Sequence, residues 1–142
     1  MYKDILLTVD LANHQTHGKA VETAITLAQA YKARLHVISV VPDFGMSIVG
    51  NFFPKDYEKQ VIESANKQLH EFTRKAVPAD VQVQHIVGHG PVYKEIIHYA
   101  DKTGCDLIIM AAHRPELSDY LLGPNAARVV RHAKQSVLVV RD

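Results

Sequence analysis

The residues with the clearest chemical potential lie in two segments of the last third of the chain, 110–115 and 121–128. The first reads Met-Ala-Ala-His-Arg-Pro and the second reads Leu-Leu-Gly-Pro-Asn-Ala-Ala-Arg. The pattern predicts a strand, a loop and a helix that begins near Gly123. Free backbone N–H groups at a helix N-terminus bind anions, helped by the helix dipole. The segment therefore predicts a phosphate site, and the alternative is an ordinary capped helix with an exposed arginine.

Each residue of this loop has a definite chemical contribution. Gly123 allows a phosphate to approach the backbone closely. Pro124 suits the first helical position, but it has no N–H to donate. His113 and Arg114 add side-chain donors, and the arginine fork can bind two phosphate oxygens at once. The free N–H groups that remain belong to Asn125, Ala126 and Ala127.

A carboxylate, Asp10, directly follows the first apolar segment of the chain. At the end of a strand it can accept hydrogen bonds from a ribose or from an adenine amino group. The alternative is that Asp10 caps the loop that follows it.

Signatures of covalent or metal-assisted catalysis are weak in this sequence. It contains neither a Gly-x-Ser-x-Gly elbow nor a Gly-x-x-x-x-Gly-Lys-Ser/Thr phosphate loop. His14 and His17 have a spacing that could share a metal, but no third ligand is evident. His36, His70 and His85 are expected at the surface or partly packed. We therefore expect no catalytic residue and no metal site.

The elements that must position these residues alternate along the chain. Strands are expected over 5–9, 35–41, 81–87, 106–110 and 136–140, and helices over 20–31, 54–76, 93–102 and 123–133. Such alternation predicts a parallel sheet with helices on both faces. The alternating third strand is expected at an edge, with a turn over 88–91 and a helix closed by Gly104. Ligands bind beyond the carboxyl ends of such strands, here in loops beginning at Asp10, Val41 and Ala111.

Composition narrows the class of protein. The chain has 142 residues, 47% of them hydrophobic and 22% charged, and a formal net charge of +1, which favours one domain over 1–142. Scattered charges of both signs argue against a nucleic-acid partner. Cys105 is the one cysteine, expected as a small half-buried residue before a strand, and it favours a reducing compartment. Without a signal-peptide pattern or an apolar run of about 18 residues, the protein is expected in the cytoplasm, away from membranes.

The whole chain resembles the universal stress proteins. The resemblance is carried by segments 2–10, 37–42, 88–91, 105–110, 122–133 and 137–141, and the His113-Arg114-Pro115 and Leu-Gly-x-Asn-Ala-Ala pieces resemble the smaller enterobacterial-type branch. The resemblance implies a single doubly wound α/β domain related to the adenine nucleotide alpha-hydrolases. Its five parallel strands would follow the order 3-2-1-4-5. It also implies homodimers paired through the last strand, sometimes associated into tetramers.

The resemblance further implies a site for an adenine nucleotide, ATP or AMP, with any Mg²⁺ arriving together with the nucleotide. Asp10 matches the aspartate on the adenosine side, Val40 matches an adenine contact, and Gly90 falls in the turn that borders the pocket. The complete expected set is Thr8, Val9, Asp10, Val40, Gly90, Met110, Ala111, His113, Arg114, Gly123, Pro124, Asn125 and Ala126.

The chain departs from the family's ATP motif, which reads Gly-x-x-Gly, nine residues, then Gly-Ser/Thr. Ala111 and Arg114 replace the first two glycines, the gap before Gly123 is one residue shorter, and Pro124 replaces the hydroxyl residue. ATP, AMP and no nucleotide therefore remain alternatives. The expected role is a stress-response sensor or regulator. The alternatives are a nucleotide-free member acting through protein contacts and a slow ATPase, for which His113 is the one candidate base.

Overall fold

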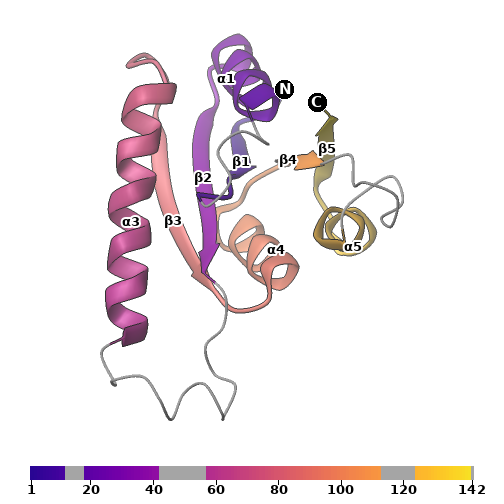
Figure 1. Ribbon diagram of the computed structural model, residues 1–142. Helices are drawn as coiled ribbons and strands as arrows, with labels where there is room; N and C mark the ends of the chain where they lie inside the picture. The colour runs from indigo at the N-terminus through magenta and orange to yellow at the C-terminus, as the bar shows by residue number, and fades with distance from the viewer. Residues whose placement is uncertain (12–17, 42–56, 113–123, 142) are drawn as a thin grey trace.

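The computed structural model describes residues 1–11, 18–41, 57–112 and 124–141, in which strands and helices alternate (Figure 1). The strands are all parallel and form one sheet in the order β3-β2-β1-β4-β5, so the expected fold class and strand order are confirmed. The elements are β1 (Asp4–Thr8), α1 (Gly18–Tyr31), β2 (Arg34–Val41), α3 (Tyr57–Ala76), β3 (Val83–His89), α4 (Val92–Thr103), β4 (Leu107–Ala112), α5 (Pro124–His132) and β5 (Ser136–Arg141).

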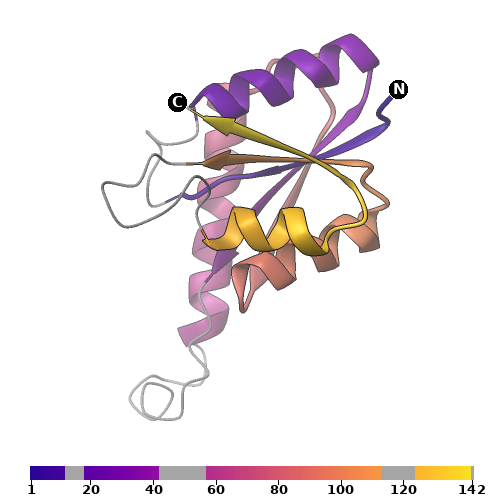
Figure 2. The ribbon, with the colours of Figure 1, turned by 90° about the vertical axis from the view of Figure 1, so that its right-hand side faces the viewer.

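Helices cover both faces of the sheet, and this explains the apolar runs of the central strands. In Figure 2 the sheet separates α1 from α4 and α5. Ile5 and Leu7 of β1 pack in the cluster that includes α1 and α3, whereas Leu6 packs in the cluster with α4 and α5. Because successive side chains of a strand point to opposite faces, a strand covered on both sides is mostly apolar.

α3 is a long helix held by a narrow apolar stripe. The expected spacing of apolar residues from Ile62 to Ala76 is present, but the deepest burial belongs to Leu69, which has no exposed surface. Burying one such side chain is worth about 1.5–3 kcal/mol. The helix begins at Tyr57, while the proline expected in its first turn, Pro54, lies outside the described residues. Most of the α3 surface therefore faces solvent, although the helix packs along β3 and β2.

Among the described residues, no helix combines the length and the apolar character that crossing a membrane requires.

α4 ends at the residue that the sequence predicts. Gly104 adopts the left-handed conformation with φ 71°, and its N–H donates to the Asp101 carbonyl. The next N–H, that of Cys105, donates to the Ala100 carbonyl over 3.0 Å. These two bonds satisfy carbonyls that the helix end would otherwise leave without partners.

Two expected chain segments differ from the structure because strand pairing continues further than expected. The turn expected over 88–91 is shorter, since Gly88 and His89 belong to β3 and pair with Val40 and Val41 of β2. The loop expected to begin at Ala111 begins later, since 111 and 112 pair with β5. In both places the partner strand supplies hydrogen bonds that local sequence does not reveal.

The expectation for His36 is wrong. Its side chain is 2% exposed, because β2 lies between β1 and β3 and is covered on both faces. Nε2 lies 2.9 Å from Oδ1 of Asp4 at the start of β1, which gives the buried ring one polar partner.

The Asp106 carboxylate accepts the N–H groups of Lys3 and Asp4, at 3.0 Å and 3.2 Å, and so joins the start of β1 to the start of β4.

Cys105 is buried more deeply than expected, with 4% of its surface exposed immediately before β4. Burial raises the pKa of its thiol to about 11, and a contact of 3.1 Å between Sγ and the Thr103 hydroxyl only partly opposes this effect. The thiolate is the reactive form of cysteine, so Cys105 is not a nucleophile at neutral pH.

We expect Asp4→Ala to lower the free energy of unfolding by about 1–3 kcal/mol, because the buried His36 ring loses its partner. Asp101→Ala is the matched control, because the contacts of its carboxylate are exposed: an ion pair with Lys134 over 3.6 Å and a hydrogen bond from Gln135 over 2.7 Å. Exposed pairs contribute about 0–1 kcal/mol. Urea unfolding followed by circular dichroism measures both variants, and equal losses would contradict the importance of the Asp4–His36 contact.

Candidate functional site

The winding of the sheet reverses between its two neighbouring strands β1 and β4. After β1 the chain continues to α1 on one face, and after β4 it continues to α5 on the opposite face (Figure 2). The two connections separate at the carboxyl ends of the strands, and such a point is where open α/β sheets bind ligands. The carboxyl ends of β1 and β4 are therefore the candidate site.

Three of the expected site residues lie on the same face of the sheet. Met110 belongs to the cluster with α4 and α5, and Val40 packs against that cluster. Thr8 follows Leu6 by two positions and so shares its face. The structure thus brings side chains from β1, β2 and β4 together on the side that α5 covers.

Val9 and Ala111 belong to the opposite face. Their side chains pack in the cluster beneath α1 and α3, where Val9 is 6% exposed. The Val9 N–H donates to the Ile38 carbonyl over 2.9 Å and continues the β1–β2 pairing past the end of β1. Val9 and Ala111 therefore face the α5 side of the sheet only with their backbone atoms.

Asp10 is exposed and comes directly after this bond, beyond the carboxyl end of β1. Nearby, the Thr8 hydroxyl donates to the Ile109 carbonyl over 3.5 Å, a long contact that bridges β1 and β4 just after their regular pairing ends at Leu7. A carboxylate and a hydroxyl thus lie close to the reversal point.

The carboxylate of Glu95, a residue of α4, contacts the end of β3, and sequence reasoning missed this polar group. Its Oε1 accepts the His89 N–H over 2.8 Å from the first turn of α4. Gly88 leaves room for it, since a Cβ atom there would lie 3.2 Å from the Glu95 Cβ and 3.4 Å from the Val40 side chain. Gly90 adopts φ 129°, which favours glycine, and this turn brings α4 back to the strand. A glutamate soon after a Gly-Pro turn is a signal that could have indicated this contact.

His89 also connects this edge to α3. Its Nδ1 lies 3.2 Å from Oε1 of Glu58, in the first turn of α3. Two carboxylates, Glu58 and Glu95, therefore bind the side chain and the backbone of one residue at the end of β3. Negative charge near a helix N-terminus is favoured by the helix dipole.

α5 begins at Pro124, in agreement with the predicted helix start. Ala126 is 4% exposed and Val129 is fully buried, so the first turn is held firmly on the sheet. Asn125 is half-buried beside them, and the basic residues Arg131 and His132 occupy the last turn, where the helix dipole favours positive charge. The N–H groups at the start of α5 are therefore fixed relative to β4.

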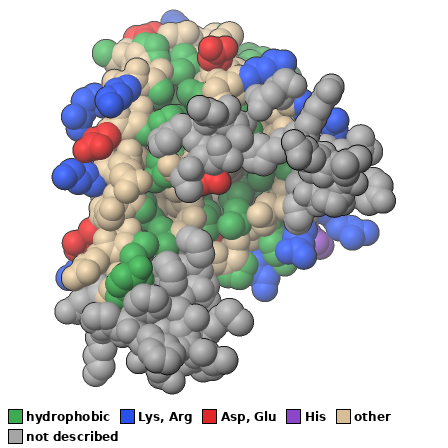
Figure 3. Space-filling model, viewed as in Figure 1, with side chains coloured by type: hydrophobic (Ala, Val, Ile, Leu, Met, Phe, Trp, Pro, Cys, Tyr) green, Lys and Arg blue, Asp and Glu red, His purple; other side chains and the backbone are tan. Residues whose placement is uncertain are grey.

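The remaining expected site residues, His113, Arg114 and Gly123, lie outside the described residues. Within the described part of the chain, no group of three or more His, Cys, Asp or Glu side chains could hold a metal ion. Figure 3 shows Lys and Arg interspersed with Asp and Glu on one face of the molecule. The described part of the chain thus includes the residues expected on the adenosine side and the helical turn expected on the phosphate side.

Comparisons with known proteins agree with this fold. A model of the universal stress protein family matches residues 1–141. Universal stress protein G of Escherichia coli O157:H7 is 30% identical over 143 residues, which cover 99% of this chain and 100% of that protein. Among solved structures, universal stress protein MJ0577 of Methanocaldococcus jannaschii gives a TM-score of 0.72 at 25% identity, covering 100% of this chain and 97% of that one.

A universal stress protein solved in complex with cAMP gives a TM-score of 0.62 at 22% identity, covering 99% of this chain and 97% of that one. At this identity the likeness concerns the fold. The family match over nearly the full length and the shared strand order lead to one conclusion. The chain belongs to the universal stress protein family.

Proposed function

We propose that the chain binds an adenine nucleotide, ATP or AMP, at the carboxyl edge of β1, β2 and β4 and acts as a stress-response regulator. The observation that carries this proposal is the convergence of Thr8, Val40 and Met110 with the start of α5 on one face of the reversal point. A universal stress protein of the same fold binds cAMP, which is also an adenine nucleotide. Any Mg²⁺ would arrive bound to the nucleotide phosphates.

Different residues would contact the adenine, the ribose and the phosphates. The apolar side chains of Val40 and Met110 suit an adenine ring, and the exposed Asp10 carboxylate suits the hydroxyl groups of a ribose. The N–H groups of Asn125 and Ala126 suit a phosphate, because they begin a helix whose dipole attracts anions. His113 and Arg114 would add donors to the phosphates.

Pro124 affects how many phosphate groups the site can bind. Because proline has no N–H, the first turn of α5 offers one donor fewer than another residue would provide. AMP needs fewer donors than ATP, so this position favours the smaller phosphate group.

The last strand provides the surface for the homodimer that we propose together with nucleotide binding. β5 forms one edge of the sheet, and its apolar residues Val137, Leu138 and Val139 are each only half-buried. Within the described residues, Val139 belongs to neither hydrophobic cluster. Pairing two β5 strands would cover this edge, which isolated chains leave open to solvent.

Nucleotide binding is tested by calorimetric titration of nucleotide-free protein with ATP and Mg²⁺, and separately with AMP. We expect saturable heat with at least one ligand and an affinity about tenfold weaker in Asp10→Ala, which loses a charge-assisted hydrogen bond. Asp80→Ala, an exposed aspartate that contacts Gln29, is the matched control and should bind normally. Absence of heat with both nucleotides would overturn the proposal in favour of a member acting through protein contacts.

Pro124→Ser should bind ATP more tightly than the natural chain, because it restores an N–H and adds a hydroxyl. A charge-assisted hydrogen bond contributes about 1.5–3 kcal/mol, equivalent to roughly tenfold or more in affinity. Pro78→Ser, at the end of α3, is the control proline. Unchanged or weaker ATP binding by Pro124→Ser would show that this position does not limit phosphate binding.

Val139→Asp should shift the protein from dimer toward monomer, because two β5 strands would bring like charges together. Analytical ultracentrifugation measures the mass, and circular dichroism confirms that the variant is folded. Val130→Asp, on a side chain of α5 that is 47% exposed, is the control and should keep the natural mass. A folded Val139→Asp protein that remains dimeric would place the interface elsewhere.

A further inference from the structure

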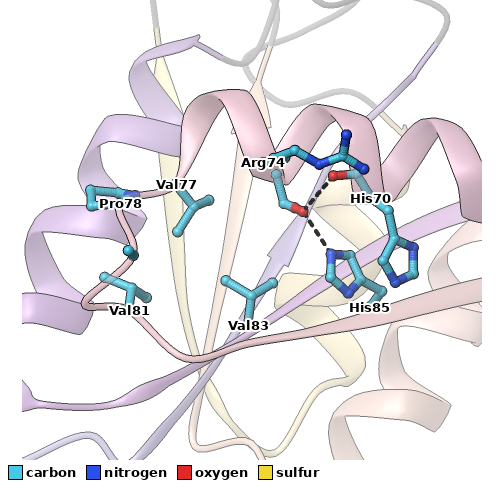
Figure 4. Close-up of a pocket in the computed structure, with 9 residues that line it drawn as sticks. His70, Arg74, Val77, Pro78, Val81, Val83 and His85 are labelled. Carbon is cyan, nitrogen blue, oxygen red and sulfur yellow. Dashed lines mark hydrogen bonds between the residues drawn. The ribbon is translucent and has the colours of Figure 1, made fainter.

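A pocket of about 430 Å³ lies between α3 and β3 at the sheet edge opposite β5, away from the candidate nucleotide site. One wall is a single face of α3, and the other is a run of alternate residues on the strand side. In Figure 4 the helix passes above the opening and the strand passes below it. The lining residues are His70, Thr73, Arg74, Val77, Pro78, Ala79, Val81, Val83 and His85.

The pocket is divided into an apolar half and a polar half. Figure 4 shows Val77, Pro78 and Val81 at one end, Val83 in the middle, and His70, Arg74 and His85 at the other end. The lining contains no carboxylate. The neighbouring Asp80 contacts Gln29 of α1. A ligand that matches this surface has an aliphatic part and an anionic part.

The polar half is organised by hydrogen bonds and stacking. The Thr73 hydroxyl donates to the His70 carbonyl over 3.1 Å, and its oxygen lies 2.6 Å from Nε2 of His85. The rings of His70 and His85 stack with centroids 3.6 Å apart. Burial and, secondly, the nearby His70 lower the pKa of His85, which favours the neutral ring. Arg74 is the permanent cation of the pocket.

The adjacent edge of β3 offers backbone groups to a further strand. The Gln82 carbonyl and the Gly90 N–H bond to β2, so the backbone groups of the intervening odd-numbered residues point outward. Those of Val83, His85 and Val87 have no strand partner among the described residues. Residues 83–89 also contain no Lys, Arg, Asp, Glu or Pro, the residue types that usually protect an edge from added strands.

Glu95 limits how far an added strand could extend. Its carboxylate already accepts the outward N–H of His89, so the free stretch ends at Val87. The open edge and the pocket share Val83 and His85, whose side chains line the pocket and whose backbone groups face outward. One ligand can therefore use both at the same time.

We propose that the groove between α3 and β3 binds an extended segment of a partner protein. The segment adds a strand to β3 and places an aliphatic side chain beside Val83 and an acidic side chain beside Arg74. Main-chain hydrogen bonds would give affinity, and the two halves of the pocket would select the side chains.

Strand geometry fixes the spacing of the two recognised side chains. Val83 and His85 are two residues apart on one face of β3, a separation of about 6.6 Å along a strand. An added strand has the same repeat, so its aliphatic and acidic residues must also be two positions apart. A spacing of one would turn the carboxylate away from the pocket.

The test uses a fluorescein-labelled, C-terminally amidated heptapeptide, Thr-Val-Thr-Asp-Thr-Val-Thr, which has the correct spacing in both chain directions. Fluorescence anisotropy should show saturable binding to the natural protein. Arg74→Glu should weaken it about tenfold or more, since an attraction becomes a repulsion. Lys75→Glu is the matched control, because Lys75 is exposed on the same helix but does not line the pocket, and it should bind normally.

Three variant probes separate the elements of the proposal. The aspartate is replaced by lysine, or moved by one position, or the backbone amides of alternate residues are methylated to prevent strand pairing. Each change should reduce binding about tenfold or more. Amide exchange measured by nuclear magnetic resonance should slow at Val83, His85 and Val87 when the natural probe binds, and circular dichroism confirms that both protein variants are folded.

The proposal fails if the heptapeptide does not bind at millimolar concentration, or if Arg74→Glu and Lys75→Glu weaken its binding equally. Hexanoate that binds as tightly as the peptide would instead identify a site for small organic acids. Self-association that excludes the probe would identify a second copy of the chain as the occupant. None of these outcomes depends on nucleotide binding, because the groove shares no residue with the nucleotide site.

Discussion

The pairing of β1 between β2 and β4 is the constraint on which the rest of the molecule depends. Ile5, Leu6 and Leu7 have no exposed surface, so both faces of this strand must be covered by helices. Parallel neighbours on both sides require crossover connections. The connection to β2 runs over one face and the connections that lead through β4 to β5 run over the other. The central crevice is a direct consequence of burying this one strand.

The same arrangement separates the molecule into surfaces with different tasks. The reversal point at the centre carries the proposed nucleotide site, while the two outer strands, β5 and β3, each have one side without a strand partner in the part of the chain that the structure describes. The edges are chemically unlike. The central residues of β5, Val137 to Val140, are all aliphatic, whereas β3 includes two histidines and packs against α3. A sheet with unlike edges can join one kind of partner at each of them without competition.

Local patterns predicted the elements well because their signals are local. The apolar run at Ile5, the helical spacing around Leu69 and the glycine at Gly104 each identify one element without information from the rest of the chain. Strand order followed from the family resemblance and is confirmed.

Features that depend on distant partners were missed. His36 is polar, and only its position between two covered strands and its contact with Asp4 explain its burial. The continuation of β4 to Ala112 depends on β5, because Ala112 pairs with Arg141, which lies 29 residues later in the chain. Glu95 resembles any exposed helix residue until the turn at Gly90 brings it to the end of β3. The expected phosphate-side residues His113 and Arg114 lie outside the described residues and stay predictions.

The burial of Cys105 has a consequence for a protein of a stress-related family. Thiols are oxidised through the thiolate, and with a pKa of about 11 only roughly one thiol in ten thousand is ionised at pH 7. The side chain is also sealed beneath α4, with 4% of its surface exposed. The chain's single thiol therefore resists conversion to sulfenic acid while the fold is intact. Oxidation at this position therefore requires that the fold open around Cys105, so a sulfenic acid there would report local or global unfolding.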